Sequence, residues 1–150
     1  IHTSYLKALR PVLPRIHAMA HITGGGLPGN LNRALPADLD AVVETSSWRV
    51  PNLFAQLQKA GGVSRDEMFR AFNMGVGMVV ITSSADVDAV KSSANAAGIT
   101  AWSLGRIQRS QQSFVQLSDG RAQSAKHFLH IFFAGGKPKT VSYGSPLRHT

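Results

Sequence analysis

Residues 20–30 read Ala-His-Ile-Thr-Gly-Gly-Gly-Leu-Pro-Gly-Asn, an apolar run that passes through a histidine and a threonine into three consecutive glycines. Leucines at 27, 31 and 35 follow with the i, i+4 spacing of a helix face. The stretch therefore predicts a strand, a glycine turn and the start of a helix. The first N–H groups of a helix lack intrahelical partners, and glycines let a backbone approach an anion closely. Two interpretations stay open here: a cradle for a phosphate or carboxylate, and a tight turn that merely needs glycine.

Length, composition and charge set the broad class. A chain of 150 residues is long enough for one domain with a substantial core. No apolar run approaches the ~18 residues of a membrane span, and Lys7, Arg10 and Arg15 interrupt any signal-peptide pattern. Cysteine is absent, which excludes disulfides and thiolate catalysis and is compatible with the cytoplasm. Because the chain lacks an initiating methionine and begins inside a helix-like segment, we expect it to be a piece of a longer protein.

The net charge of +8 raises the question of nucleic-acid binding. Half of this charge lies in residues 118–150, and the rest is spread thinly over the preceding residues. The basic residues form neither a helix face nor a cluster with interleaved aromatics, as single-strand binders use. We therefore expect no specific nucleic-acid partner and no membrane partner.

Helix and strand patterns follow one another in a mixed order. Helices are predicted over residues 3–13, 51–60, 64–72 and 84–97, and a further helix is predicted to begin at residue 27. The signals are the spacing of apolar residues, the positions of prolines and glycines, and the Ser64–Glu67 capping box. Strands are predicted over 16–22, 41–45, 74–82, 100–107 and 113–117. This order predicts an α+β fold, a mixed β-sheet with helices packed on one face. The continuous apolar character of 74–82 predicts a strand buried on both faces.

The sequence changes character after residue 117. Residues 1–117 form the predicted domain, and 118–150 carry a short apolar island, 128–133, among glycines, lysines and polar residues. No helix or strand pattern of convincing length is found there. We interpret 118–150 as an atypical basic tail that is poorly ordered and carries no chemistry.

Two groups of residues are candidates for a site. His21 could bind an anion or act as a general acid or base, or be a strand-end histidine bonded to backbone; Thr23 could donate to the same anion or cap the turn. Asn73 ends a predicted helix, and Gly75 and Gly77 flank the start of the buried strand. A glycine in a strand indicates a close approach to the backbone, by a ligand or by a neighbouring helix.

Other chemistries find little support. Six acidic residues lie at helix starts or turns, where capping explains them better than metal binding: Asp38, Asp40, Asp66, Glu67, Asp86 and Asp88. We therefore expect no metal site. Ser46 and Ser47 have no histidine or carboxylate in a triad-like relation.

Three motifs together resemble a known family. The first is His21–Gly26, the second is Ser46-Ser47-Trp48 with Pro51 and Phe54, and the third is Phe72-Asn73-Met74-Gly75-Val76-Gly77-Met78. In this order and spacing they resemble the C-terminal domain of the phosphoribosylformylglycinamidine cyclo-ligase (AIR synthetase) family, from about Tyr5 to Leu117. The resemblance implies an AIR-synthetase C-terminal-domain-like fold.

The resemblance also implies an activity, the ATP-dependent ring closure of formylglycinamidine ribonucleotide to aminoimidazole ribonucleotide in purine synthesis. It implies that ATP and Mg²⁺ bind largely to an N-terminal domain that is not part of this chain, that the full-length enzyme is a homodimer, and that the fragment alone is inactive. On this chain it assigns substrate or phosphate binding to His21, Thr23, Gly24, Gly25, Gly26, Asn30, Asn73, Gly75 and Gly77.

The chain departs from the family pattern at two positions of the first loop. Gly29 stands where the family usually has a glutamate, and Asn32 stands where it usually has a proline. Two alternatives therefore stay open: another member of the wider superfamily, of the small-molecule kinase type, and a non-catalytic anion-binding domain.

Overall fold

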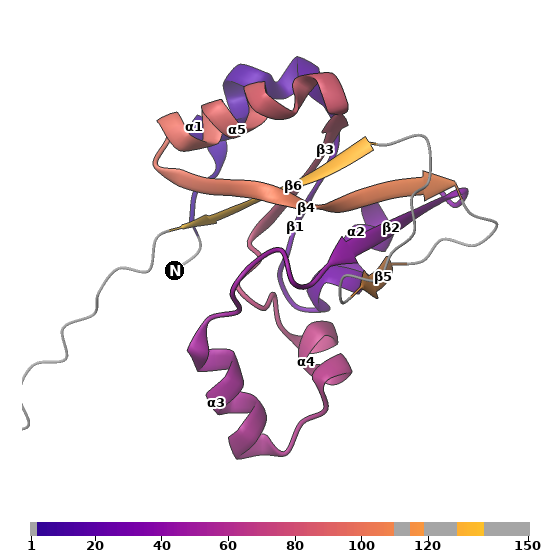
Figure 1. The fold of residues 1–150 in the computed structure, drawn as a ribbon, viewed down its shortest axis with the longest axis vertical. Coiled ribbons are helices and arrows are strands. Elements are labelled where there is room, and N and C mark those ends of the chain that lie inside the picture. The colour runs from indigo at the N-terminus through magenta and orange to yellow at the C-terminus, as the bar shows by residue number, and fades with distance from the viewer. Residues whose placement is uncertain (1–2, 110–114, 119–128, 137–150) are drawn as a thin grey trace, which may run out of the picture.

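The computed structural model describes residues 3–109, 115–118 and 129–136, and its centre is one six-stranded sheet (Figure 1). Its strands are β1 (Ile16–His21), β2 (Leu39–Glu44), β3 (Met78–Ser83), β4 (Ile99–Arg109), β5 (Val115–Ser118) and β6 (Leu129–Gly136). They lie in the order β1-β3-β6-β4-β2-β5. Every neighbouring pair is antiparallel except β2 and β5, which are parallel. The predicted mixed sheet of an α+β fold is confirmed.

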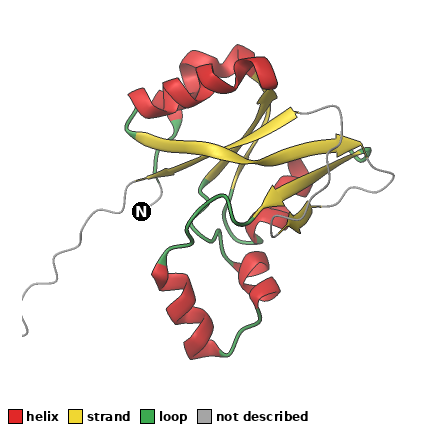
Figure 2. Cartoon of the chain, viewed as in Figure 1, coloured by secondary structure: helices red, strands yellow, loops and turns green. Residues whose placement is uncertain are grey.

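Helices cover both faces of this sheet (Figure 2). They are α1 (Leu6–Leu9), the 3₁₀ helix η1 (Arg10–Arg15), α2 (Gly26–Ala34), α3 (Asn52–Gly61), α4 (Arg65–Ala71), the 3₁₀ helix η2 (Ser84–Asp86) and α5 (Val87–Ala96). α1 and α5 lie on one side of the sheet and α2 on the other, while α3 and α4 project beyond the sheet (Figure 1). None of the helices in the described part of the chain is long and apolar enough to cross a membrane.

The prediction that helices pack on one face is wrong, and β3 shows why. Val79 and Ile81 of β3 belong to the main core with Leu27 of α2, whereas Val80 packs with Val90 of α5. Because successive side chains of a strand point to opposite faces, a strand that is apolar at every position needs cover on both. The two-sided burial predicted for this strand is thus correct, and it requires helices on both faces.

Three predicted elements have different limits in the structure. The predicted helix over 3–13 is a short α1 continued by η1, because Pro11 and Pro14 lack the N–H groups that an α-helix would use. The predicted strand 74–82 begins only at Met78, since residues 73–76 form a turn closed by the hydrogen bond from Val76 to Asn73. The helix predicted from Ser84 starts as η2 and becomes α-helical at Val87.

β6 lies in the middle of the sheet, within the segment predicted to be a tail. Its backbone pairs with β3 on one side and with β4 on the other, Val80↔Phe132 and Ser103↔Phe132 being two of the registers. The prediction that 118–150 contains no strand is therefore wrong for 129–136, and Ser118 belongs to β5. Periodicity failed here because a short apolar run does not specify its partners. The poor order predicted for residues 119–128 and 137–150 concerns residues outside the described ones.

Candidate anion-binding site at the glycine loop

The structure brings the three sequence motifs together at one end of β1 and β3. The N–H of Ile22, in the first motif, donates to the carbonyl of Gly77, in the third, at 2.8 Å. Trp48, in the second motif, donates its indole N–H to the carbonyl of Met74 at 3.0 Å. The same indole packs edge-on against Phe69 of α4, with ring centroids 6.3 Å apart. Segments more than twenty residues apart in sequence therefore build one local structure.

Gly25 and Gly26 form the turn between β1 and α2. Both have positive φ angles, +92° and +59°, which residues with a Cβ adopt only at a cost. The N–H of Gly26 donates to the carbonyl of Thr23 at 3.1 Å, which closes the turn. A Cβ on Gly26 would lie 1.9 Å from the carbonyl oxygen of Phe69, so this glycine also lets α2 pack against α4. A tight turn and close packing therefore account for Gly26 without any ligand.

Gly24 has a different environment from Gly26. An added Cβ at Gly24 would meet no atom within 4 Å, and its φ is not positive. At Gly25 the nearest atoms to an added Cβ are 3.9 Å away. Thr23, Gly24 and Gly25 are all exposed. This part of the loop consequently offers its backbone to molecules outside the protein.

The buried side chain of Asn30 donates hydrogen bonds to several carbonyl groups of the glycine loop. Its Nδ2 donates to the carbonyls of Gly26 at 2.7 Å, Gly24 at 3.3 Å and Thr23 at 3.5 Å. None of the described peptide bonds is cis, and in a trans peptide the C=O and the following N–H point in opposite directions. The N–H groups that follow these carbonyls, those of Gly24, Gly25 and Leu27, therefore point away from Asn30.

Two of these N–H groups suit an anion, because Gly24 and Gly25 are exposed whereas Leu27 is fully buried. The loop's own hydrogen bonds among the described residues do not use them. They lie at the N-terminus of α2, where the helix dipole adds partial positive charge, and Pro28 in the first turn has no N–H to lose. Exposed backbone N–H groups at a helix start can bind a phosphate or carboxylate.

His21 and Thr23 flank the loop on the β1 side. His21 is the last residue of β1, is exposed, and lies edge-on to Tyr5 with ring centroids 6.2 Å apart. Burial raises the pKa of the Tyr5 phenol, so this ring is a neutral neighbour of His21 at physiological pH. The exposed side chain of Thr23 is near enough in sequence to share an anion with Gly24 and Gly25. Whether either residue binds a ligand stays a prediction.

Asn73 and Gly75 build the turn of the third motif. The side-chain oxygen of Asn73 accepts from the N–H of Gly75 at 3.0 Å, and its carbonyl accepts from Val76 at 2.8 Å. Met74 between them has a positive φ of 53°, as does Gly75 with 92°. A Cβ on Gly75 would lie 2.6 Å from Cδ of Pro51, so the approach predicted here is made by the second motif. The ligand role predicted for Asn73, Gly75 and Gly77 is untested by these contacts.

Arg33 and Arg65 are basic residues beside the three motifs that the sequence interpretation did not single out. Arg33 donates to Oδ1 of Asn30 at 2.7 Å, and Arg65 lies over the Phe69 ring, 5.3 Å from its centroid, with a hydrogen bond of 2.8 Å to Thr45. Arg33 follows Asn30 by three residues on the same helix, a spacing that places two side chains side by side. This i, i+3 spacing is the sequence signal that could have predicted the contact between Arg33 and Asn30.

Comparison with known proteins shows the family of this chain. The family described as "AIR synthase related protein, C-terminal domain" matches residues 3–118. The chain belongs to this family. The match includes all three motifs of the AIR synthase related C-terminal domain and ends before β6 begins.

Three relatives of this AIR synthase related domain share one name. Proteins named phosphoribosylformylglycinamidine cyclo-ligase are 47% identical over 103 residues in Methylobacillus flagellatus and 46% identical over 109 residues in Neisseria gonorrhoeae. A third, from an Anaeromyxobacter species, is 43% identical over 108 residues. The alignments cover 69%, 71% and 72% of this chain but only 29%, 32% and 31% of the relatives. The chain thus spans about a third of their length.

Proposed function

We propose that this chain is the C-terminal, substrate-side portion of a phosphoribosylformylglycinamidine cyclo-ligase. The observation that carries the proposal is the pair of exposed N–H groups of Gly24 and Gly25, beside His21 and Thr23. Its relatives bear the name of this ligase, whose reaction in purine synthesis converts formylglycinamidine ribonucleotide to aminoimidazole ribonucleotide.

The proposed reaction uses the loop to position charge. The ring closes after phosphoryl transfer from ATP activates the amide oxygen, and such chemistry depends on positioning and charge neutralisation. In this proposal the loop N–H groups bind an anionic group of the ribonucleotide substrate, its phosphate or the transferred phosphoryl group. Asn73, Gly75 and Gly77 also contribute to substrate binding in this proposal, and Gly75 lies against Pro51 of the second motif.

The remaining parts of the proposal concern the longer protein. ATP and Mg²⁺ bind largely to an N-terminal domain outside this chain, and the full-length enzyme is a cytoplasmic homodimer without specific nucleic-acid or membrane partners. The described residues contain no group of three or more histidine and acidic side chains that could hold a metal ion. The fragment alone is inactive in this proposal because it lacks the ATP-binding domain.

Calorimetric titration of the 150-residue chain with formylglycinamidine ribonucleotide tests the proposal, with ribose 5-phosphate as the control ligand. Saturable binding that is stronger for the ribonucleotide supports a substrate site on this chain. No binding by a sample that circular dichroism shows to be folded contradicts it. Binding of both ligands with equal affinity favours the alternative of a non-catalytic anion-binding domain, which the glycine at position 29 also favours. The other alternative, a small-molecule kinase of the same superfamily, is distinguished from the cyclo-ligase by the sequence of the nucleotide-binding domain beyond this chain.

A variant pair localises the binding. Gly24→Val places a side chain in open space above the loop without straining a positive φ. We expect it to lower ribonucleotide affinity by about tenfold or more, the equivalent of one hydrogen bond to a charged group. Ser92→Val is the matched control, because it places the same side chain at an exposed position of α5, on the other side of the sheet. Equal affinities for Gly24→Val and wild type contradict binding at the loop.

A further inference from the structure

We propose that Asn30 and Arg33 are positioning residues that preset the glycine loop for an anion without touching the anion themselves. The inference rests on the proposed anion site and adds how that site is held ready. Asn30 is 8% exposed, and its amide contacts the side of the loop opposite to the outward N–H groups. Arg33 lies one turn further along α2, on the solvent side.

Arg33 fixes which way the Asn30 amide faces. A guanidinium has only donors, so the atom of Asn30 that faces Arg33 must be the acceptor Oδ1. The bond from Arg33 Nη2 to Oδ1 is 2.7 Å long, and Nε of Arg33 is held by the carbonyl of Gly29 at 3.1 Å. With Oδ1 committed to Arg33, the donor Nδ2 must face the loop.

The loop side needs a donor, not an acceptor. Three carbonyls, those of Thr23, Gly24 and Gly26, converge on Nδ2, and carbonyl oxygens gathered around one point repel each other unless a donor lies between them. Reversal of the Asn30 amide would place Oδ1 among them. Arg33 therefore acts on the loop through Asn30, and the direction of the Gly24, Gly25 and Leu27 N–H groups depends on both residues.

Asn30→Asp is the sharpest variant, since aspartate has nearly the same shape but offers an oxygen on each side. It keeps a partner for Arg33 and removes the donor to the three carbonyls. Asn32→Asp is its matched control, because it makes the same change of charge at an exposed position two residues along the same helix. Arg33→Gln, at an exposed position, is a second variant that keeps the test decisive if Asn30→Asp does not fold, and Arg70→Gln, also exposed, is its control.

The first measurement is a titration with inorganic phosphate, in which the NMR amide resonances of Gly24, Gly25 and Leu27 report binding. We expect Asn30→Asp to weaken phosphate binding by about tenfold or more, because a displaced loop N–H no longer donates to the charged anion, and Arg33→Gln to weaken it several-fold. Asn32→Asp and Arg70→Gln should stay within about twofold of wild type, as expected for exposed charges. Wild-type affinity in a folded Asn30→Asp or in Arg33→Gln overturns the proposal.

The second measurement needs no ligand. In wild type the side-chain amide protons of Asn30 should exchange slowly with solvent, and Arg33→Gln should speed this exchange and shift the Gly24 and Gly25 amide resonances. Exchange at the wild-type rate in Arg33→Gln overturns the positioning role. If phosphate shifts no loop resonance in wild type, the proposed anion site is contradicted. The exchange measurement then still shows whether Arg33 and Asn30 fix the conformation of the loop.

Discussion

At the scale of single residues, three consecutive glycines meet three different physical demands. Gly26 combines a positive φ with a contact so close to Phe69 that no side chain fits. Gly25 needs only the positive φ, and Gly24 needs neither. The glycine run is therefore one pattern in sequence but contains a packing residue, a turn residue and an open residue.

Gly26→Ala should lower the free energy of unfolding by about 2 kcal/mol or more, because the strained φ alone costs a residue with a Cβ of order 1–3 kcal/mol. The added Cβ would also lie 1.9 Å from the Phe69 carbonyl oxygen. Gly29→Ala should instead raise the free energy of unfolding by about 0.5–1 kcal/mol, since glycine within a helix is less stable than alanine. Urea unfolding monitored by circular dichroism measures both changes. Equal stability of the two variants contradicts the assignment of Gly26 to packing.

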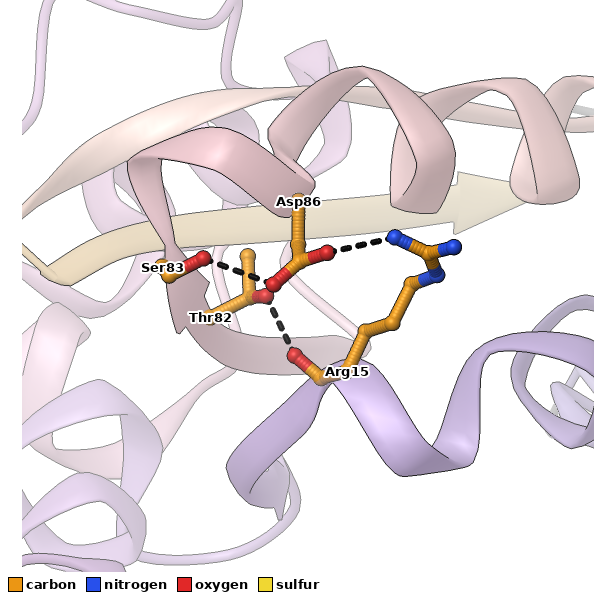
Figure 3. A network of polar contacts seen from close by, with 4 residues as sticks. All are labelled: Arg15, Thr82, Ser83 and Asp86. Carbon is orange, nitrogen blue, oxygen red and sulfur yellow. Dashed lines mark hydrogen bonds and ion pairs between the residues drawn. The ribbon is translucent and has the colours of Figure 1, made fainter.

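At the scale of elements, a small polar network joins η1 to the end of β3 and to η2 (Figure 3). Asp86 accepts from Ser83 Oγ at 2.7 Å and from Arg15 Nη1 at 2.6 Å. Thr82, which is fully buried, donates its hydroxyl to the carbonyl of Arg15. These contacts connect residues about seventy positions apart, so they fix the N-terminal segment to the sheet.

The hydrogen bonds from Ser83 and Arg15 lower the pKa of Asp86 from its ordinary value of 3.8. A carboxylate with a lowered pKa contributes stability above its ordinary pKa, and this contribution is lost as the pH falls through the lowered value. Asp86→Asn should therefore be less stable than wild type at pH 6, and the difference should shrink below about pH 4. Urea unfolding between pH 2.5 and pH 6, conditions set by that ordinary pKa, measures it. Asp88→Asn, at an exposed position of α5, is the control; a difference for Asp86→Asn that persists at the lowest pH argues against the network.

At the scale of the whole molecule, β6 joins the two halves of the sheet. β1 and β3 lie on one side of it, and β4, β2 and β5 lie on the other. The registers run from Met78↔Ala134 to Ser83↔Leu129 with β3, and from Ile99↔Gly136 to Ile107↔Leu129 with β4. The sheet is therefore continuous only through residues that lie beyond the matched family region, 3–118.

Truncation after Ser118 tests this arrangement. Removal of β6 breaks the ladder between β3 and β4, so we expect a clear loss of stability and a lower urea m-value, because less surface is buried in the remaining fold. A chain that ends at Gly136 retains all described strands and is the matched control. If the chain that ends at Ser118 unfolds with the midpoint and m-value of the full chain, residues 129–136 do not hold the sheet together, and the tail interpretation is restored.

The sequence by itself determined the local elements and the family. Period and capping signals placed β1, α2, α3 and β4 close to their observed limits, and Ser64 Oγ does accept from the N–H of Glu67 at 3.3 Å. Such signals act between residues that are near one another in the chain. Motifs of fixed spacing likewise identified the AIR synthase related domain, since they require no knowledge of the contacts between them.

Three features could be seen only in the tertiary structure. They are the position of β6 in the sheet, the packing of helices on both of its faces, and the different roles of the three glycines in the loop. Each of these depends on contacts between residues distant in sequence: β6 against β3 and β4, Gly26 against Phe69, Trp48 against Met74. The sequence of a strand does not specify which strands pair with it, and a glycine in the sequence does not show which residue packs against it. Long-range packing, which local patterns do not encode, therefore settled which residues shape the glycine loop and which stay exposed.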